Sequence, residues 1–129
     1  MQKIIKRVSL ILAVALSVVC LCMFASACGE ATEFTVTVYY SDGTTKVNGD
    51  DYTVVVQFCV DDACYSNNPT VDKNGEAKIS IATLEGWKKS DEYVLHVFDS
   101  DGNVTIKSGD TKVSKSSPTA KLVIDKPAP

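Results

Sequence analysis

Alternation of apolar and polar residues dominates the chain after residue 32. In the stretch FTVTVYY, Phe34, Val36 and Val38 alternate with threonines. Successive side chains of a strand point to opposite faces of a sheet, so this period predicts strands with one dry and one wet face. Asn-Gly and Asp-Gly pairs, which suit tight turns, separate the alternating runs. We expect an all-β fold of about seven strands, packed as two antiparallel sheets in a β-sandwich. The expected strands cover residues 33–40, 53–60, 65–71, 76–82, 92–98, 103–108 and 119–125, and residues 82–90 can form one short turn of helix.

The start of the chain has a different character. MQKIIKR carries three bases and no acid, and the 17 residues from Val8 to Phe24 carry no charge. A basic segment followed by an apolar one is the order found in an export signal. The small residues Ala25-Ser26-Ala27 then precede Cys28. We therefore expect an N-terminal signal helix and cleavage before Cys28, which makes residues 1–27 a signal peptide.

The residues around Cys28 also resemble the signal of a bacterial lipoprotein. The match is a relaxed lipobox, with Ala25 where leucine is usual. The resemblance implies that Cys28 is lipidated and that the protein is extracytoplasmic and anchored to the cell membrane. Two alternatives stay open. An uncleaved signal anchor is one, because 17 residues reach the lower edge of the roughly 17–25 that span a bilayer; full secretion is the other.

Removal of residues 1–27 leaves 129 − 27 = 102 residues, which is the size of one domain. We expect a short tether at 28–32, a β-sandwich domain at 33–126 and a tail at 127–129. All 16 acidic residues follow Cys28, whereas three of the 13 basic residues lie in the signal, so the mature charge is 10 − 16 = −6. Nucleic acid is not an expected partner, because phosphate binding needs a basic patch.

Four short stretches resemble the prealbumin-like and carboxypeptidase-regulatory-like modules of bacterial surface proteins. They are VTVYYSDGT (36–44), YTVVVQFC (52–59), TVDKNGEAKISI (70–81) and YVLHV (93–97). The resemblance implies an Ig-like, prealbumin-like sandwich and a place at the cell surface. It implies no particular activity.

Cys59 and Cys64 are separated by four residues, within FCVDDACY. In an oxidising compartment, two cysteines so placed can lie at the two ends of a tight connection and form a disulfide. We expect this bond to hold the loop 61–68 in shape and to leave Cys28 as the odd cysteine of the mature chain, which a lipid would explain. Free thiols, a redox centre and a zinc site are weaker alternatives. The chain has no C-x-x-C motif, and two thiols with one distant histidine do not supply four zinc ligands.

The polar and aromatic candidates carry little chemistry on their own. His96, the only histidine, lies in the middle of an expected strand, where a packed or half-exposed side chain is more common than a general base. The stretch DSDGN (99–103) has the wrong register for a calcium loop and predicts a hairpin turn. Trp87, Tyr39 and Tyr52 are possible ligand-binding residues, since exposed aromatic rings stack on sugars or anchor partner proteins. The alternative for Trp87 is that it folds back and caps one end of the sandwich.

These features favour a non-catalytic, membrane-anchored module that binds or spaces a glycan or a protein at the bacterial cell surface. We expect no metal and no cofactor. One alternative is a carbohydrate-binding module that uses exposed aromatics, and another is a small extracytoplasmic enzyme of unknown reaction. One prealbumin-fold lineage is hydrolytic and uses an arginine, but the mature chain contains none.

Overall fold

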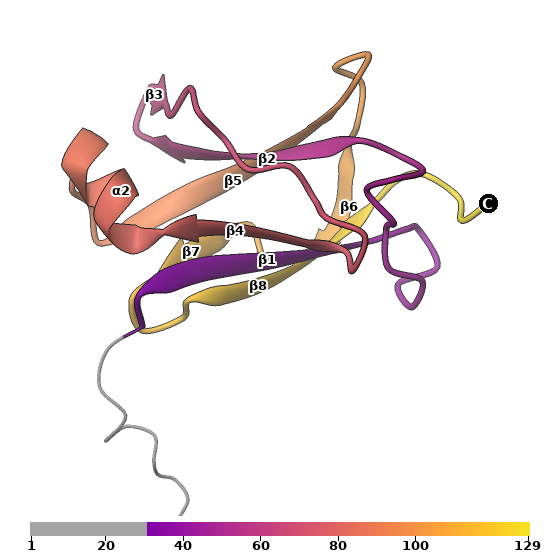
Figure 1. Ribbon diagram of the computed structural model, residues 1–129, viewed down its shortest axis with the longest axis horizontal. Coiled ribbons are helices and arrows are strands. Elements are labelled where there is room, and N and C mark those ends of the chain that lie inside the picture. Colours follow the sequence, from indigo (N-terminus) through magenta and orange to yellow (C-terminus); the bar gives the residue numbers. More distant parts are fainter. Residues whose placement is uncertain (1–30) are drawn as a thin grey trace, which may run out of the picture. The chain divides into compact units, whose positions relative to one another are not determined.

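The computed structural model describes residues 31–129, so the expected signal peptide and Cys28 lie outside the described residues. Within this range β-strands are the main regular structure, with one short helix, as the alternation predicts (Figure 1). No helix in residues 31–129 is long and apolar enough to cross a membrane. The elements are β1 (Glu33–Tyr39), β2 (Val54–Val60), β3 (Ala63–Cys64), β4 (Glu76–Ser80), α2 (Ile81–Trp87), β5 (Glu92–Asp99), β6 (Ile106–Gly109), β7 (Lys112–Ser114) and β8 (Thr119–Ile124).

The strands form two sheets of four, packed face to face (Figure 1). One sheet has the order β4-β1-β8-β6 and the other has the order β3-β2-β5-β7. Among the described strands, every pair is antiparallel except β1 and β8, which run parallel from Thr35 opposite Thr119 to Tyr39 opposite Val123. The expectation of a two-sheet β-sandwich is therefore confirmed, and the expectation of purely antiparallel pairing is wrong for this one pair.

The core fills the space between the inner faces of the two sheets. Phe34 of one sheet lies against Phe58 and Tyr93 of the other, with ring centroids 6.2 Å and 5.8 Å away. Leu84 is fully buried and comes from α2, the short helix that the sequence places near residues 82–90. The other inward-facing residues of the strands are aliphatic, and buried residues alternate along β1, β5 and β8, as the sequence predicts.

The segment 65–71 is not a strand, contrary to the expectation from sequence. It runs beside β2 and forms only an isolated bridge, between Thr70 and Val55. Pro69 has no N–H to donate to a ladder, although its carbonyl accepts a hydrogen bond from Val56. Asn68 further replaces a backbone partner, because its side-chain oxygen accepts the hydrogen bond from the Phe58 N–H. The strand pairing that does occur in this region is shorter and lies earlier, in β3.

The turn after β5 joins the two sheets and does not close a hairpin. The Gly102 N–H donates to the Asp99 carbonyl, so the turn expected at residues 99–103 is present. However, β5 belongs to one sheet and β6 to the other. The expectation of a hairpin at this position is therefore wrong, because a turn sequence specifies the local bend and not the sheet that the next strand joins.

Gly109 lies where β6 departs from regular pairing with β8. The register shifts between Ile106 and Ser108, and Gly109 has a φ of 108°. A Cβ at this position would lie 2.2 Å from the carbonyl oxygen of Lys121. Both the backbone conformation and the close approach of β8 therefore require glycine here.

We expect Gly109→Ala to lower the free energy of unfolding by more than about 2 kcal/mol. Alanine would have to adopt a backbone conformation that is unfavourable to L-residues, and its Cβ would clash with β8. Gly86→Ala is the matched control, since Gly86 has open space around it and lies in a helix. It should leave stability unchanged or raise it by up to about 1 kcal/mol. Urea unfolding followed by circular dichroism measures both, and equal stability of the two variants would contradict this account of β6.

Candidate functional site

The outer surface of the β3-β2-β5-β7 sheet differs from that of the other sheet. Its central strands pair Val55 with Phe98, Gln57 with His96 and Cys59 with Val94. We call these six residues the β2–β5 face. Among residues 31–129, Phe98 is the exposed large hydrophobic residue, with 36% of its surface accessible. The face therefore combines apolar side chains with the single histidine.

The outer surface of the other sheet is mainly threonine and charge. Thr35 and Thr37 point outward from β1, and Lys121 points outward from β8. Lys78 and Glu76 of β4 form an ion pair there, at 3.4 Å. This surface offers little apolar area apart from Tyr39 and Val123, which are half-buried.

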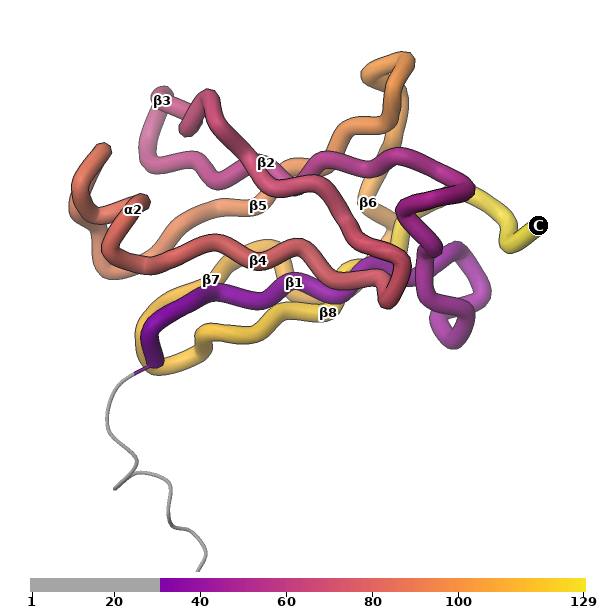
Figure 2. Tube along the Cα trace, viewed as in Figure 1, coloured from indigo at the N-terminus to yellow at the C-terminus, as the bar shows by residue number. Residues whose placement is uncertain are grey.

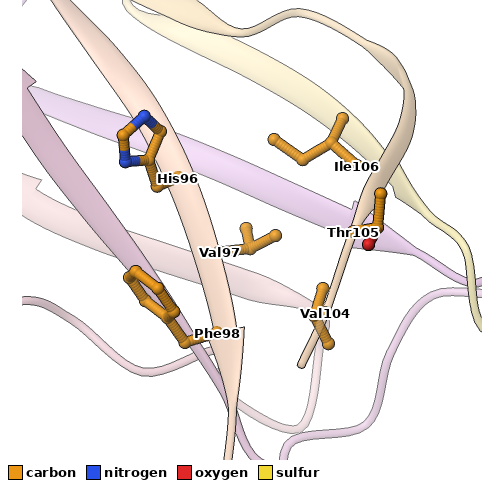
Figure 3. Close-up of a pocket in the computed structure, with 6 residues that line it drawn as sticks. All are labelled: His96, Val97, Phe98, Val104, Thr105 and Ile106. Carbon is orange, nitrogen blue, oxygen red and sulfur yellow. The ribbon is translucent and has the colours of Figure 1, made fainter. Parts of the chain in front are cut away.

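A shallow apolar pocket adjoins the β2–β5 face. Its lining comes from residues 96–98 of β5 and from residues 104–106, which lead into β6 (Figure 3). β7 pairs with β5 only at residues 92–94, so the later part of β5 lies at a less covered edge of its sheet. Figure 3 shows His96 and Phe98 on one side of β5, with Val97 turned toward the 104–106 segment. The pocket therefore shares His96 and Phe98 with the β2–β5 face and adds Val97 and the 104–106 segment.

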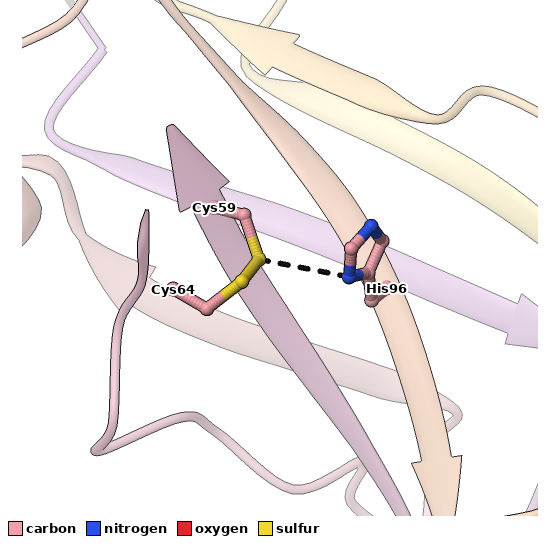
Figure 4. A group of neighbouring side chains, drawn as sticks. All are labelled: Cys59, Cys64 and His96. Atoms are coloured by element: carbon pink, nitrogen blue, oxygen red, sulfur yellow. Dashed lines mark hydrogen bonds between the residues drawn. A yellow bond between two sulfur atoms is a disulfide. The ribbon is translucent and has the colours of Figure 1, made fainter. Parts of the chain in front are cut away.

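The expected disulfide between Cys59 and Cys64 is confirmed (Figure 4). The two cysteines lie directly opposite each other in the β2–β3 register, with their Cα atoms 4.0 Å apart. The turn between them contains Asp61, which has a positive φ of 52°. The Tyr65 N–H donates to the Phe58 carbonyl just beyond the pair. The short loop between the cysteines is thus a tight hairpin with a covalent bond across its base.

His96 lies beside this disulfide. The sequence did not predict this proximity. Its Nδ1 is 3.6 Å from the Sγ of Cys59 (Figure 4). One ligand atom from each of Cys59, Cys64 and His96 falls within 4.8 Å of the others. Thiolates bind metals, whereas sulfurs already joined in a disulfide do not supply that ligand. While the disulfide is intact, the three residues therefore do not supply the ligands that a metal ion needs.

Trp87 and Tyr52 lie at opposite ends of the sandwich. Trp87 ends α2 and is half-buried, and its ring lies 5.4 Å from that of Tyr65, just after β3. Tyr52 instead precedes the first residue of β2. Figure 2 shows α2 and β3 together at one end of the fold, with the C-terminus at the other. The structure therefore does not gather the aromatic residues singled out from the sequence into one surface.

The ring and hydroxyl of Tyr52 already have intramolecular partners. The ring stacks on Tyr40 with centroids 6.2 Å apart, and the Nζ of Lys126 lies 4.7 Å from its centroid. The hydroxyl donates to the Asp99 carboxylate at 2.9 Å. Partial burial and this hydrogen bond raise the pKa of Tyr52. Tyr39 points outward from β1, on the surface of the other sheet.

The Asp99 carboxylate closes the turn after β5. It accepts hydrogen bonds from the backbone N–H groups of Asn103 and Asp101, each at 2.9 Å, and from the Tyr52 hydroxyl. The bond from Asn103, followed by the bond from Tyr52, lowers the pKa of Asp99. Asp99 therefore links the turn to the aromatic pair at this end of the sandwich.

No protein-family model matches the chain, and the searches of curated proteins and of solved structures find no significant match. The resemblance to prealbumin-like modules consequently depends on the quoted residues alone.

We expect Tyr52→Phe to weaken the pH dependence of stability in acid. Asp99 has a lowered folded pKa, so its contribution is present above its unfolded pKa of about 3.9 and is lost as pH falls through the folded value. Removing the Tyr52 hydroxyl raises the folded pKa of Asp99 and so brings it closer to the unfolded pKa of the same group. The free energy of unfolding, measured by urea titration between about pH 5 and pH 2, should then fall less steeply than in the parent protein. Tyr39→Phe is the control and should keep the parental slope; a parental slope in Tyr52→Phe would refute the link.

Proposed function

We propose that this protein is a non-catalytic lipoprotein module that is held at the outer surface of a bacterial membrane through Cys28 and binds another protein there. The proposal takes the prealbumin-like, Ig-like type of sandwich from the resemblance in the sequence. Two packed sheets of four strands are compatible with that type. An uncleaved signal anchor would give the same location by a different attachment.

The start of the folded region bears on how near the membrane such a module would lie. β1 begins at Glu33, so residues 28–32 are the whole tether between a lipidated Cys28 and the first strand. Five extended residues span at most about 17 Å. A partner would therefore have to lie close to the membrane, or reach the module from the far end of the sandwich.

The observation that carries the binding proposal is the unequal character of the two outer faces. The β2–β5 face exposes Phe98 beside the half-buried Val55, whereas the opposite surface is mostly threonine and charge. An exposed aromatic residue next to aliphatic ones is the kind of centre around which protein interfaces form. We therefore assign the partner-binding surface to the β2–β5 face.

Two further observations favour protein binding over the alternatives. Trp87 and Tyr52 lie at opposite ends of the fold, and Tyr52 is engaged by Tyr40 and Lys126, so these rings do not form a shared platform for a sugar. The Sγ of Cys59 lies 3.6 Å from the Nδ1 of His96, but it is bonded to Cys64 and so is not a free nucleophile. This arrangement supports a binding role more than an enzymatic one.

Intact-mass analysis of the protein extracted from membranes tests the anchoring. We expect the mass of residues 28–129 plus one diacylglyceryl group, less two hydrogens for the disulfide. Cys28→Ser should abolish the lipid adduct, because serine has no thiol to form the thioether. A mass that retains Met1, or a cleaved chain with an unmodified Cys28, would contradict lipidation.

Photo-crosslinking in intact cells tests the binding surface. Benzoylphenylalanine replaces Phe98 in one variant and Thr37, on the outer surface of the other sheet, in the control variant. We expect a discrete covalent adduct from position 98 that an excess of the unmodified full chain suppresses, and no such adduct from position 37. Absence of an adduct at position 98, or the same adduct at both positions, would overturn the assignment.

A further inference from the structure

We infer that the Cys59–Cys64 disulfide is a site of reversible exchange with a dithiol, in which Cys64 receives the incoming sulfur and Cys59 leaves beside His96. Cys59 and His96 belong to the β2–β5 face, but the exchange does not depend on the proposed function. It rests on three features of the hairpin: the unequal exposure of the two cysteines, the position of His96, and the bonds that hold the loop without the disulfide.

The two sulfurs differ in their access to solvent. Cys59 lies within β2 and is 3% exposed, whereas Cys64 ends β3 and is exposed. A thiolate attacks one sulfur of a disulfide and must approach it directly, so access decides which sulfur is attacked. The incoming thiolate therefore reaches Cys64, and Cys59 becomes the leaving group.

The surroundings of Cys59 suit a leaving thiolate. The Nδ1 of His96 lies 3.6 Å from its Sγ, and Nδ1–H can donate a hydrogen bond to the negative charge that develops there. The side-chain oxygen of Gln57 lies 3.7 Å from the same sulfur and can accept the S–H once Cys59 is protonated. Exchange is faster when the leaving thiol has a lower pKa, so a donor at Cys59 accelerates the step.

The reaction balances with a dithiol as the reductant. One thiolate of the dithiol bonds to the Sγ of Cys64, the S–S bond breaks, and the Sγ of Cys59 leaves with the bonding electron pair. The second thiolate then attacks the sulfur of its own molecule in the mixed disulfide, which closes a cyclic disulfide and releases Cys64. The dithiol loses two electrons, the protein disulfide gains them, and the two protons of the dithiol end on the cysteines.

The hairpin retains other bonds when the disulfide opens. The Tyr65 N–H donates to the Phe58 carbonyl, and the Phe58 N–H donates to the Asn68 side chain. The Asn68 amide also donates to the Tyr65 carbonyl. These contacts hold residues 65–68 against β2, so the two thiols stay close enough to re-form the bond. This is why we assign a reversible exchange and not an irreversible loss of structure.

The experiment uses the full chain in detergent, with free thiols blocked by iodoacetamide while the disulfide is intact. Excess dithiothreitol is added, samples are quenched with N-ethylmaleimide, and mass spectrometry follows the loss of the disulfide. We expect His96→Leu to slow the reduction by about tenfold, because leucine has no N–H to donate to the leaving sulfur. Lys78→Gln, on the opposite outer face, should reduce at the parental rate.

A second measurement needs no variant. The parent protein is treated with 2-mercaptoethanol and quenched with N-ethylmaleimide. Fragmentation in the mass spectrometer then shows which cysteine carries which adduct. We expect the mercaptoethanol on Cys64 and the maleimide on Cys59. An adduct mainly on Cys59, or a parental rate in His96→Leu with an unchanged unfolding midpoint, would overturn the inference.

Discussion

The packing of Phe34 against Phe58 and Tyr93 joins the two sheets, and the rest of the molecule depends on it. These rings fix which side of β1, β2 and β5 faces the core. Because side chains alternate along a strand, the same contact fixes which residues face outward, and a slip of one residue would exchange the two sets. The β2–β5 face is therefore a consequence of the core: Cys59, His96 and Phe98 point outward because Phe58, Leu95 and Val97 point inward.

The longer strands could be predicted from the sequence, because each has several alternating residues to report its period. β7 could not, since in Lys112–Ser114 only Val113 is buried and one apolar residue has no period. The segment 65–71 fails in the opposite way. A strand was expected there, but Pro69 has no N–H to donate and the Asn68 side chain takes the hydrogen bond from the Phe58 N–H. The parallel β1–β8 pair could not be predicted either, because alternation indicates that a segment is a strand but not which strand lies beside it.

In the candidate site, too, features set by local sequence could be predicted, and features set by tertiary structure could not. The disulfide could be predicted because two cysteines five positions apart can lie at the two ends of a tight connection, and the expected export signal would place them in an oxidising compartment. The approach of His96 to Cys59 could not, because it requires β2 and β5 to be neighbours in one particular register, with Gln57 opposite His96. The separation of Trp87 from Tyr52 likewise depends on tertiary structure. Trp87 is the last residue of α2, the helix that follows β4, and Tyr52 precedes β2 at the far end of the sandwich.

The parallel pairing of β1 and β8 determines how the domain bears mechanical load. Both strands start at the same end of the sandwich, so the chain enters through β1 at one end and leaves through β8 at the other (Figure 1). Tension applied between the two ends of the domain would slide these neighbours along each other and load their inter-strand hydrogen bonds together, instead of peeling them apart one after another. The fold thus has the connectivity of a shear-resistant link.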